Sequence, residues 1–218
     1  MVRAGRFNLL IALVFISCPA VAQVGKLYPS DEGTKDPTFQ EFRGKLIEAA
    51  KNRDAKYVMS ILDPKIQNGF DGVGGVKEFK EKWKPDNPDS ELWGVLIEIL
   101  SMGGSFTKNE FCAPYVYTKF PELDPFEHSA IIGEQVRVRE QPGLTSPIIA
   151  SLSYDIVAIT DPPTTPIKMD GHSWIAIKLS NGKTGFVSEQ FIRSPIDYRA
   201  CFTKKNGKWR MNALVAGD

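Results

Sequence analysis

The chain has 218 residues, with 27 lysines and arginines against 26 aspartates and glutamates, a formal net charge of +1. Proteins that bind the phosphates of nucleic acid need a basic excess on one face, and neither the total nor any run of residues supplies it. The charge of the chain therefore argues against nucleic acid as a partner. The length suits one elaborate domain or two small ones, each with its own hydrophobic core.

The N-terminal residues have the three parts of a secretory signal peptide. Arg3 and Arg6 precede an apolar run over residues 9–16, and an Ala-Val-Ala sequence ends at Ala22. The apolar run is too short to cross a bilayer, and no other segment is apolar for long enough. We expect residues 1–22 to be a signal peptide cleaved after Ala22, and the protein to be exported, periplasmic or secreted, without a membrane span.

A lipoprotein anchored at Cys18 is the alternative to this cleavage. Phe15-Ile16-Ser17-Cys18 would then be the lipidation motif, although phenylalanine at its first position and Pro19 after the cysteine suit it poorly. Cleavage after Ala22 removes two arginines and no acid, so 25 basic and 26 acidic side chains remain. The exported chain is therefore close to neutral.

Helical patterns fill the first part of the exported chain. Asp36 is a helix cap followed by Pro37 at the first helical position, and apolar residues from Phe39 to Ala50 recur at helical spacing. Similar patterns predict helices from about Asp54 to Pro64, over residues 76–83, and over residues 90–104. Because the aromatic residues of these helices keep helical spacing, we expect core positions for Phe39, Trp83 and Trp93.

The glycine-rich segment over residues 69–75, GFDGVGG, suggests two structures. A nucleotide-binding loop needs a lysine followed by serine or threonine after its last glycine, and this pair is absent. We therefore expect a turn between a short extended segment and the next helix.

Alternating residues mark the beginning of a second, strand-rich region. In VRVREQPG, alternation places Val136 and Val138 on one face of a strand and Arg137 and Arg139 on the other. We expect the valines to face a core and Arg139 to face outward, beside the loop that begins at Pro142.

Further short strands are predicted along the same region. Residues 148–160 read as two strands with a polar break, residues 174–179 are rich in strand-forming types, and Asn181-Gly182 is a hairpin signal. A second hairpin is predicted near the C-terminus, where Asn206-Gly207 joins residues 198–202 to residues 209–215. Because an isolated hairpin is barely stable in water, we expect it to pack on the helical region.

Residues 131–194 resemble the bacterial SH3-like (SH3b) modules of exported and cell-wall proteins. The likeness rests on VRVREQPG, with Arg137 where asparagine is usual, on Trp174 in SWIAIKL, and on GKTGFVSEQFI. It implies a small β-barrel with a binding groove beside the loop that follows the first strand. The ligand-binding residues expected from it are Arg139, Gln141, Tyr154 and Trp174.

The rest of the chain more weakly resembles the nuclear-transport-factor-2-like superfamily of cone-shaped α+β domains. The expected fold class is therefore α+β, an N-terminal helical α+β domain closed by a C-terminal hairpin, with a small SH3-like β-barrel between them. The expected boundaries are residues 23–128 for the first part of the helical domain, 129–194 for the barrel and 195–218 for the hairpin.

Cys112 and Cys201 are the two cysteines that follow the signal peptide. In an oxidising compartment they could form a disulfide that fixes the hairpin to the helical domain. Two buried free thiols are the alternative.

Candidate catalytic groups are few. His128 and His172 are the only histidines, so Cys112 with His128 is the one conceivable thiol dyad, and it lacks a recognisable third partner. The two histidines form no zinc signature, so we expect no metal and no cofactor. The acidic residues of the connector, which we expect to be solvated, are Glu122, Asp124 and Glu127.

These observations favour a non-enzymatic protein. We expect an exported binding module whose SH3-like barrel recognises a cell-envelope ligand, either a stem peptide of peptidoglycan or an envelope protein. Because this expectation rests on a resemblance of fold, two other classes stay open. One is an envelope enzyme that uses a pocket of the α+β domain, and the other is a purely structural interaction protein.

Overall fold

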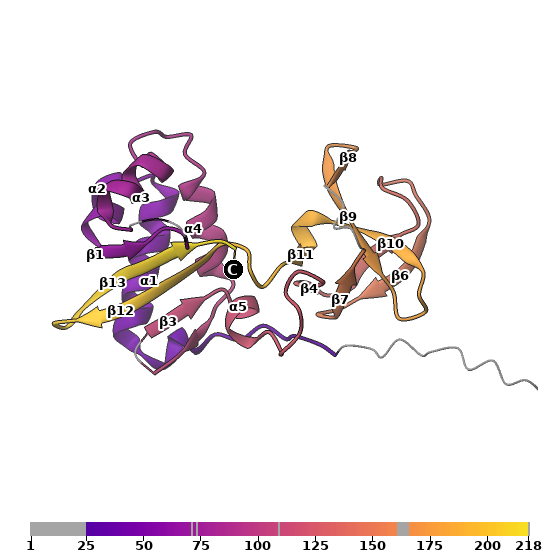
Figure 1. Cartoon of the computed structure of the whole chain (residues 1–218), viewed down its shortest axis with the longest axis horizontal. Helices are drawn as coiled ribbons and strands as arrows, with labels where there is room; N and C mark the ends of the chain where they lie inside the picture. Colours follow the sequence, from indigo (N-terminus) through magenta and orange to yellow (C-terminus); the bar gives the residue numbers. More distant parts are fainter. Residues whose placement is uncertain (1–24, 71, 73, 109, 161–165, 218) are drawn as a thin grey trace, which may run out of the picture.

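The computed structural model describes residues 25–70, 72, 74–108, 110–160 and 166–217. The predicted signal peptide and the Cys18 alternative lie outside the described residues. The described chain has a mixed α+β fold with two β-sheets in two lobes (Figure 1). We call residues 31–127 with 198–217 the helical lobe, and residues 128–193 the strand lobe. No helix of the described residues is long and apolar enough to cross a bilayer.

The described part of the helical lobe has the four helices that the sequence predicts and two short ones that it does not predict, η1 (Glu32–Lys35) and α5 (Tyr115–Lys119). The predicted four are α1 (Pro37–Lys51), α2 (Ala55–Ser60), α3 (Val76–Trp83) and α4 (Leu92–Ser101). Asp36 caps α1 as predicted, because its Oδ1 accepts hydrogen bonds from the backbone N–H groups of Thr38 and Phe39 at 2.8 and 3.1 Å. The prediction for α2 is wrong at its end, since the chain enters a strand at Leu62 before reaching Pro64.

The C-terminal hairpin lies at the centre of the sheet of the helical lobe. The strands are β1 (Leu62–Gln67), β2 (Ser105–Phe106), β3 (Glu110–Ala113), β12 (Arg199–Lys205) and β13 (Lys208–Val215), in the order β1-β13-β12-β3-β2. Asn206 and Gly207 have φ values of 48° and 75°, as a two-residue hairpin turn requires. The hairpin therefore packs on the helical region by pairing with it on both sides, and Figure 1 shows it in yellow across the lobe.

Aromatic residues fill the space between this sheet and the helices. The Phe39 ring of α1 lies with its centroid 4.2 Å from that of Phe111 and 4.9 Å from that of Trp209. Phe39 is fully buried, and Trp83 and Trp93 are each 5% exposed, so all three predicted core positions are confirmed. Edge-to-face and tilted ring pairs of this kind add to the stability that burial alone provides.

The glycine-rich segment joins β1 to α3. The backbone N–H of Gly75 donates to the carbonyl of Ile66 at 2.6 Å, and that of Gly74 donates to Oε2 of Glu78 at 2.7 Å. The Glu78 carboxylate thus occupies the backbone N–H of Gly74, which a phosphate-binding loop would offer to its phosphate. In its described residues, the segment is therefore a turn, and Glu78 of the following helix α3 stabilises it.

The strand lobe contains the second sheet. Its strands are β4 (His128–Ile131), β5 (Val136–Arg139), β6 (Ile148–Leu152), β7 (Ile156–Ile159), β8 (Ile167–Met169), β9 (His172–Lys178), β10 (Thr184–Ser188) and β11 (Ile192–Arg193), with η2 (Glu189–Phe191) before the last. The order is β11-β4-β7-β9-β10-β5-β6, and β8 pairs with β9. Within the described chain the two end strands of this path, β11 and β6, do not pair with each other, so hydrogen bonds do not close the sheet into a barrel. Val136 and Val138 lie in its core, as predicted.

A strap over residues 25–31 joins the two lobes. Lys26 forms an isolated bridge with Asp155 of the strand lobe, and Asp31 forms one with Gly104 of the helical lobe. Between these points Leu27 is buried in a hydrophobic cluster to which both lobes contribute: Leu27, Tyr115, Val116, Ala130 and Ile156. The first residues of the strap, which the prediction places in the helical domain, therefore pair with the strand lobe instead. Figure 1 shows the strap in indigo beneath both lobes.

Candidate functional site

The strand lobe contains a cavity of about 270 Å³. Strands β5, β9 and β10, the short helix η2 and the loop over residues 140–147 enclose it. Its lining residues are Glu134, Gln135, Val136, Arg137, Arg139, Leu144, His172, Trp174, Ser188, Gln190 and Phe191. The cavity lies beside the loop after β5, where the sequence predicts a binding groove.

Arg139 lies at the end of β5 and is only 9% exposed. Its Nη1 donates to the carbonyl of Ser146 at 2.6 Å, and the Glu140 N–H donates to the carbonyl of Pro147 at 2.9 Å. Arg139 lies beside the loop, as expected, but it is buried and does not face outward. The loop folds back over the guanidinium, and the register of β5 against β6 shifts between Val138 and Arg139.

Trp174 of β9 forms part of the cavity wall and is 2% exposed. Its Nε1 donates to the carbonyl of Met169 at 3.1 Å, which holds the indole against the β8–β9 turn. The His172 ring lies edge-on to the indole, with centroids 6.4 Å apart. A buried indole with its donor satisfied gives the cavity a rigid apolar wall.

Two exposed apolar side chains lie at the cavity mouth. Leu144 is 50% exposed and Phe191 is 42% exposed. The Leu144 N–H donates to Oδ2 of Asp170 at 2.8 Å, and the Phe191 carbonyl accepts from the Ile132 N–H at 3.0 Å. Backbone hydrogen bonds thus hold both residues in place, so an apolar group entering the cavity meets preformed contacts.

The cavity has one buried charge, on Arg139, and two exposed charges at its rim. Arg139 forms no ion pair with a carboxylate among the residues that the structure describes. A charge taken out of water is costly unless it is paired and hydrogen-bonded, so this guanidinium favours an anionic partner. Arg137 adds an exposed positive charge and Glu134 an exposed negative one at the rim.

The structure brings two of the four predicted ligand-binding residues together. Arg139 and Trp174 both line the cavity, whereas Gln141 and Tyr154 do not. Gln141 uses its N–H to bond Oγ of Ser146 at 2.9 Å, and Tyr154, with a φ of 59°, packs against Tyr28 of the strap.

The residues that the sequence reasoning missed lie in a loop and in a short helix. Leu144 follows Pro142-Gly143, and Phe191 is the last residue of the short helix η2, near the end of GKTGFVSEQFI. No signal in the sequence could have identified them, because single apolar residues are common on protein surfaces and only their grouping at one cavity distinguishes these two.

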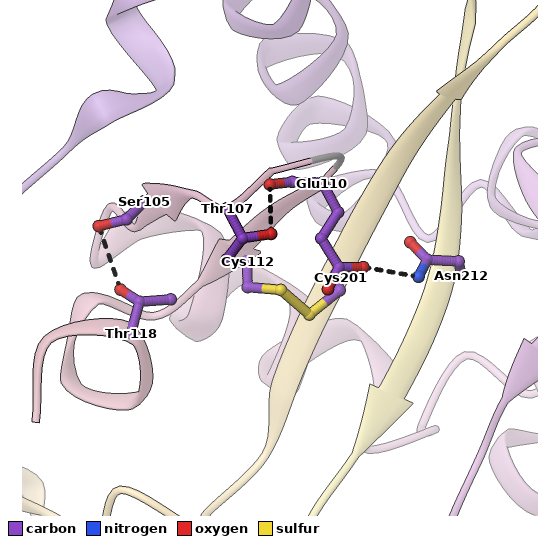
Figure 2. The surroundings of a disulfide bond; sticks show 7 residues. All are labelled: Ser105, Thr107, Glu110, Cys112, Thr118, Cys201 and Asn212. Carbon is purple, nitrogen blue, oxygen red and sulfur yellow. Dashed lines mark hydrogen bonds between the residues drawn. A yellow bond between two sulfur atoms is a disulfide. The ribbon is translucent and has the colours of Figure 1, made fainter. Parts of the chain in front are cut away.

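Cys112 and Cys201 are joined by a disulfide (Figure 2). The bond links β3 to β12, and so fixes the C-terminal hairpin to the rest of the helical lobe. A cysteine held in a disulfide has no thiolate, so Cys112 cannot form a dyad with His128 in this state. The sequence left open a disulfide or two buried free thiols, and the structure has the disulfide.

The helical lobe has a surface depression of about 470 Å³ over α1 and α2. Its titratable residues include Glu41, Lys45 and Tyr57. A hydrogen bond from Lys45 lowers the pKa of Glu41, and burial raises the pKa of Tyr57. Both shifts keep these groups in their ordinary charge states, which suits neither a general acid nor a general base near neutral pH. Glu122, Asp124 and Glu127 of the connector are exposed, as expected.

Comparison with protein-family models, with curated proteins and with solved structures gives no match for this chain. Its function must therefore be inferred from the cavity and its chemistry.

Proposed function

We propose that the protein is an exported, non-enzymatic binding module that holds a cell-envelope peptide in the cavity of the strand lobe. The strand lobe would correspond to an SH3-like barrel, and the cavity to the groove beside the loop after its first strand. The observation that carries the proposal is the buried guanidinium of Arg139, which faces a cavity with apolar walls and lacks an acidic partner among the described residues.

The chemistry of the cavity suggests which part of a peptide it holds. A guanidinium matches a carboxylate with two parallel hydrogen bonds, so a C-terminal or side-chain carboxylate is the preferred group on Arg139. Leu144, Trp174 and Phe191 would contact a small aliphatic side chain next to that carboxylate. Stem peptides of peptidoglycan have small aliphatic residues and free carboxylates, and the C-terminus of an envelope protein offers the same chemistry.

The test is a calorimetric titration of the full exported chain with two versions of a soluble stem peptide. One version has its free C-terminal carboxylate and the other a carboxamide at the same position. A hydrogen bond to a charged group contributes about 1.5–3 kcal/mol, so we expect the carboxamide to bind roughly 10- to 150-fold more weakly. Equal affinity for both versions would contradict the role of Arg139.

Matched arginine variants locate the site. Arg139→Met should remove the preference for the free carboxylate, whereas Arg53→Met, at an exposed position of the helical lobe, should leave it unchanged. If neither peptide binds, a pull-down from solubilised envelope proteins tests the protein partner, with Arg139→Met as its control. Cleavage of the peptide during the titration would instead support the enzyme alternative.

A further inference from the structure

The disulfide of the helical lobe shares its face of the sheet with a carboxylate. Cys112 and Cys201 lie directly opposite each other on β3 and β12, and Glu110 lies two residues before Cys112 on the same strand. Since side chains two apart on a strand point to the same side, all three project from one face. One carboxylate oxygen of Glu110 and the two sulfur atoms lie within 4.8 Å of one another.

Polar groups around this cluster orient the carboxylate. Nδ2 of Asn212 donates to Oε2 of Glu110 at 3.0 Å, and Figure 2 shows the Glu110 side chain extending toward Cys201. Two further oxygens nearby on the strands, Oδ1 of Asn212 and Oγ1 of Thr203, are buried and have no hydrogen-bond partner among the described residues. Thr203 pairs directly with Glu110 across the sheet. A buried site with unused acceptors is suited to a cation or to its bound water.

We propose that reduction of this disulfide creates a site for a single zinc ion, with Cys112, Cys201 and Glu110 as its three protein ligands. Tetrahedral zinc with bonds of about 2.3 Å to sulfur and 2.0–2.2 Å to oxygen places its ligand atoms roughly 3.5–3.8 Å apart. The three atoms already lie within 4.8 Å, so small side-chain rotations suffice. The fourth position is left to water, for which the buried oxygens of Asn212 and Thr203 provide acceptors.

The chemistry proceeds in two steps. A dithiol reductant donates two electrons and two protons, breaks the sulfur–sulfur bond and leaves as its own disulfide, giving two cysteine thiols. Zinc then binds both sulfurs and displaces their two protons, while the Glu110 carboxylate binds without proton release. Oxidation reverses the sequence and expels the ion, because a disulfide offers no thiolate. The site is therefore closed to zinc in the oxidised state.

The surroundings favour retention of the ion. Cys112 is 2% exposed and Cys201 is 7% exposed, so the ion would be largely shielded from solvent. Both cysteines lie on neighbouring strands whose pairing continues on either side of them, from Glu110–Thr203 to Ala113–Ala200. This backbone pairing holds the ligands together after the sulfur bond is broken. The proposal uses the helical lobe alone and is independent of peptide binding in the strand lobe.

The experiment uses the full exported chain, reduced with a phosphine and checked by its gain of two hydrogens in mass. Cobalt(II) serves as a spectroscopic probe and zinc as its competitor. We expect one cobalt per reduced chain with an intense sulfur-to-cobalt charge-transfer band, displacement of the cobalt by zinc, and no binding to the oxidised chain. Circular dichroism checks that the reduced chain stays folded. Absence of the band in a folded reduced chain overturns the proposal, and so does unfolding on reduction.

A carboxamide variant distinguishes this site from any flexible pair of thiols. Glu110→Gln keeps both cysteines and removes one ligand, so it should weaken zinc binding by at least the 10- to 100-fold that loss of an outer-shell partner costs. Glu127→Gln, an exposed acid of the connector, is the matched control and should bind zinc like the unmodified chain. Equal zinc affinity of Glu110→Gln and the control overturns the role of the carboxylate and, with it, the proposed site.

Discussion

Arg137 and Arg139 differ in burial although the sequence pattern gives them equivalent positions. Arg137 and Arg139 occupy equivalent places in the alternation of VRVREQPG, yet Arg137 is exposed and Arg139 is covered by the loop over residues 140–147. Alternation predicts which side of a strand a residue occupies, but it does not predict what packs over that side. The difference turns one of two similar arginines into the centre of the candidate site.

A second arginine–carboxylate contact gives a pH dependence that can be measured. Nη1 and Nη2 of Arg43 donate to the two carboxylate oxygens of Asp31, each at 2.7 Å. The hydrogen bond from Arg43 lowers the pKa of Asp31 below its ordinary value of 3.8. A group with a lowered folded-state pKa stabilises the fold above its unfolded pKa, and this stabilisation is lost as the pH falls through the folded pKa.

We therefore expect Asp31→Asn to reduce the free energy of unfolding by a constant amount at neutral and mildly acidic pH. Below about pH 4 the difference between the variant and the unmodified chain should shrink, because Asp31 takes up a proton first in the unfolded state and, at lower pH, in the folded state. Urea unfolding at a series of pH values measures it. A difference that stays constant down to the acid end of the series would show that the pairing does not depend on ionised Asp31.

At the scale of elements, the C-terminal hairpin holds the helical lobe together. β12 and β13 lie between β1 and β3, so β1 has no other strand partner in the described sheet. Met211 and Leu214 of β13 are fully buried in the core that α1 and α4 share. The strand lobe has a separate core, formed around Val138 and Ile177.

Deletion of residues 197–218 should therefore unfold the helical lobe and spare the strand lobe. The loss of the two central strands exposes a sheet edge and the aromatic core, at a cost comparable with the whole stability of a domain, about 5–15 kcal/mol. Limited proteolysis with mass spectrometry is the measurement, and we expect a resistant fragment close to residues 128–193. A resistant fragment over residues 36–120 would contradict the central role of the hairpin.

At the scale of the molecule, the strap and one ion pair couple the lobes. Arg193 of the strand lobe is 5% exposed and forms a salt bridge with Glu98 of α4. The strap adds the buried Leu27 and a hydrogen bond of 2.7 Å from its N–H to the Tyr154 carbonyl. The lobes thus share a hydrophobic cluster in addition to the chain segments that connect them.

Leu27→Asp should uncouple the lobes without unfolding either one. A buried carboxylate without a partner is costly, so we expect the strap to detach from the shared cluster. Calorimetry should then resolve two thermal transitions in place of a single cooperative one, with Pro29→Ala, at an exposed position of the strap, as the control. A single unchanged transition in Leu27→Asp would show that the strap does not couple the lobes.

The sequence predicts local features of this fold better than its long-range pairings. The Asp36 cap, the Asn206-Gly207 turn and the core valines of β5 depend on neighbouring residues, and the structure has them. The end of α2 at Ser60 could not be predicted, because β1 exists only through pairing with a strand about 150 residues later. In the candidate site, Arg139 and Trp174 could be identified, whereas Leu144 and Phe191 depend on how loops pack.

The central position of the hairpin also sets an order of events as the chain is made. Synthesis delivers β3 and the helices first, then the whole strand lobe, and only afterwards β12 and β13. Because domains fold as units while the chain emerges, the strand lobe can complete its core while the helices still lack the middle of their sheet. Cys112 likewise cannot form its disulfide until Cys201, 89 residues later in the chain, has been synthesised. Every newly made molecule therefore passes through a stage in which this cysteine is a free thiol that can react with other molecules.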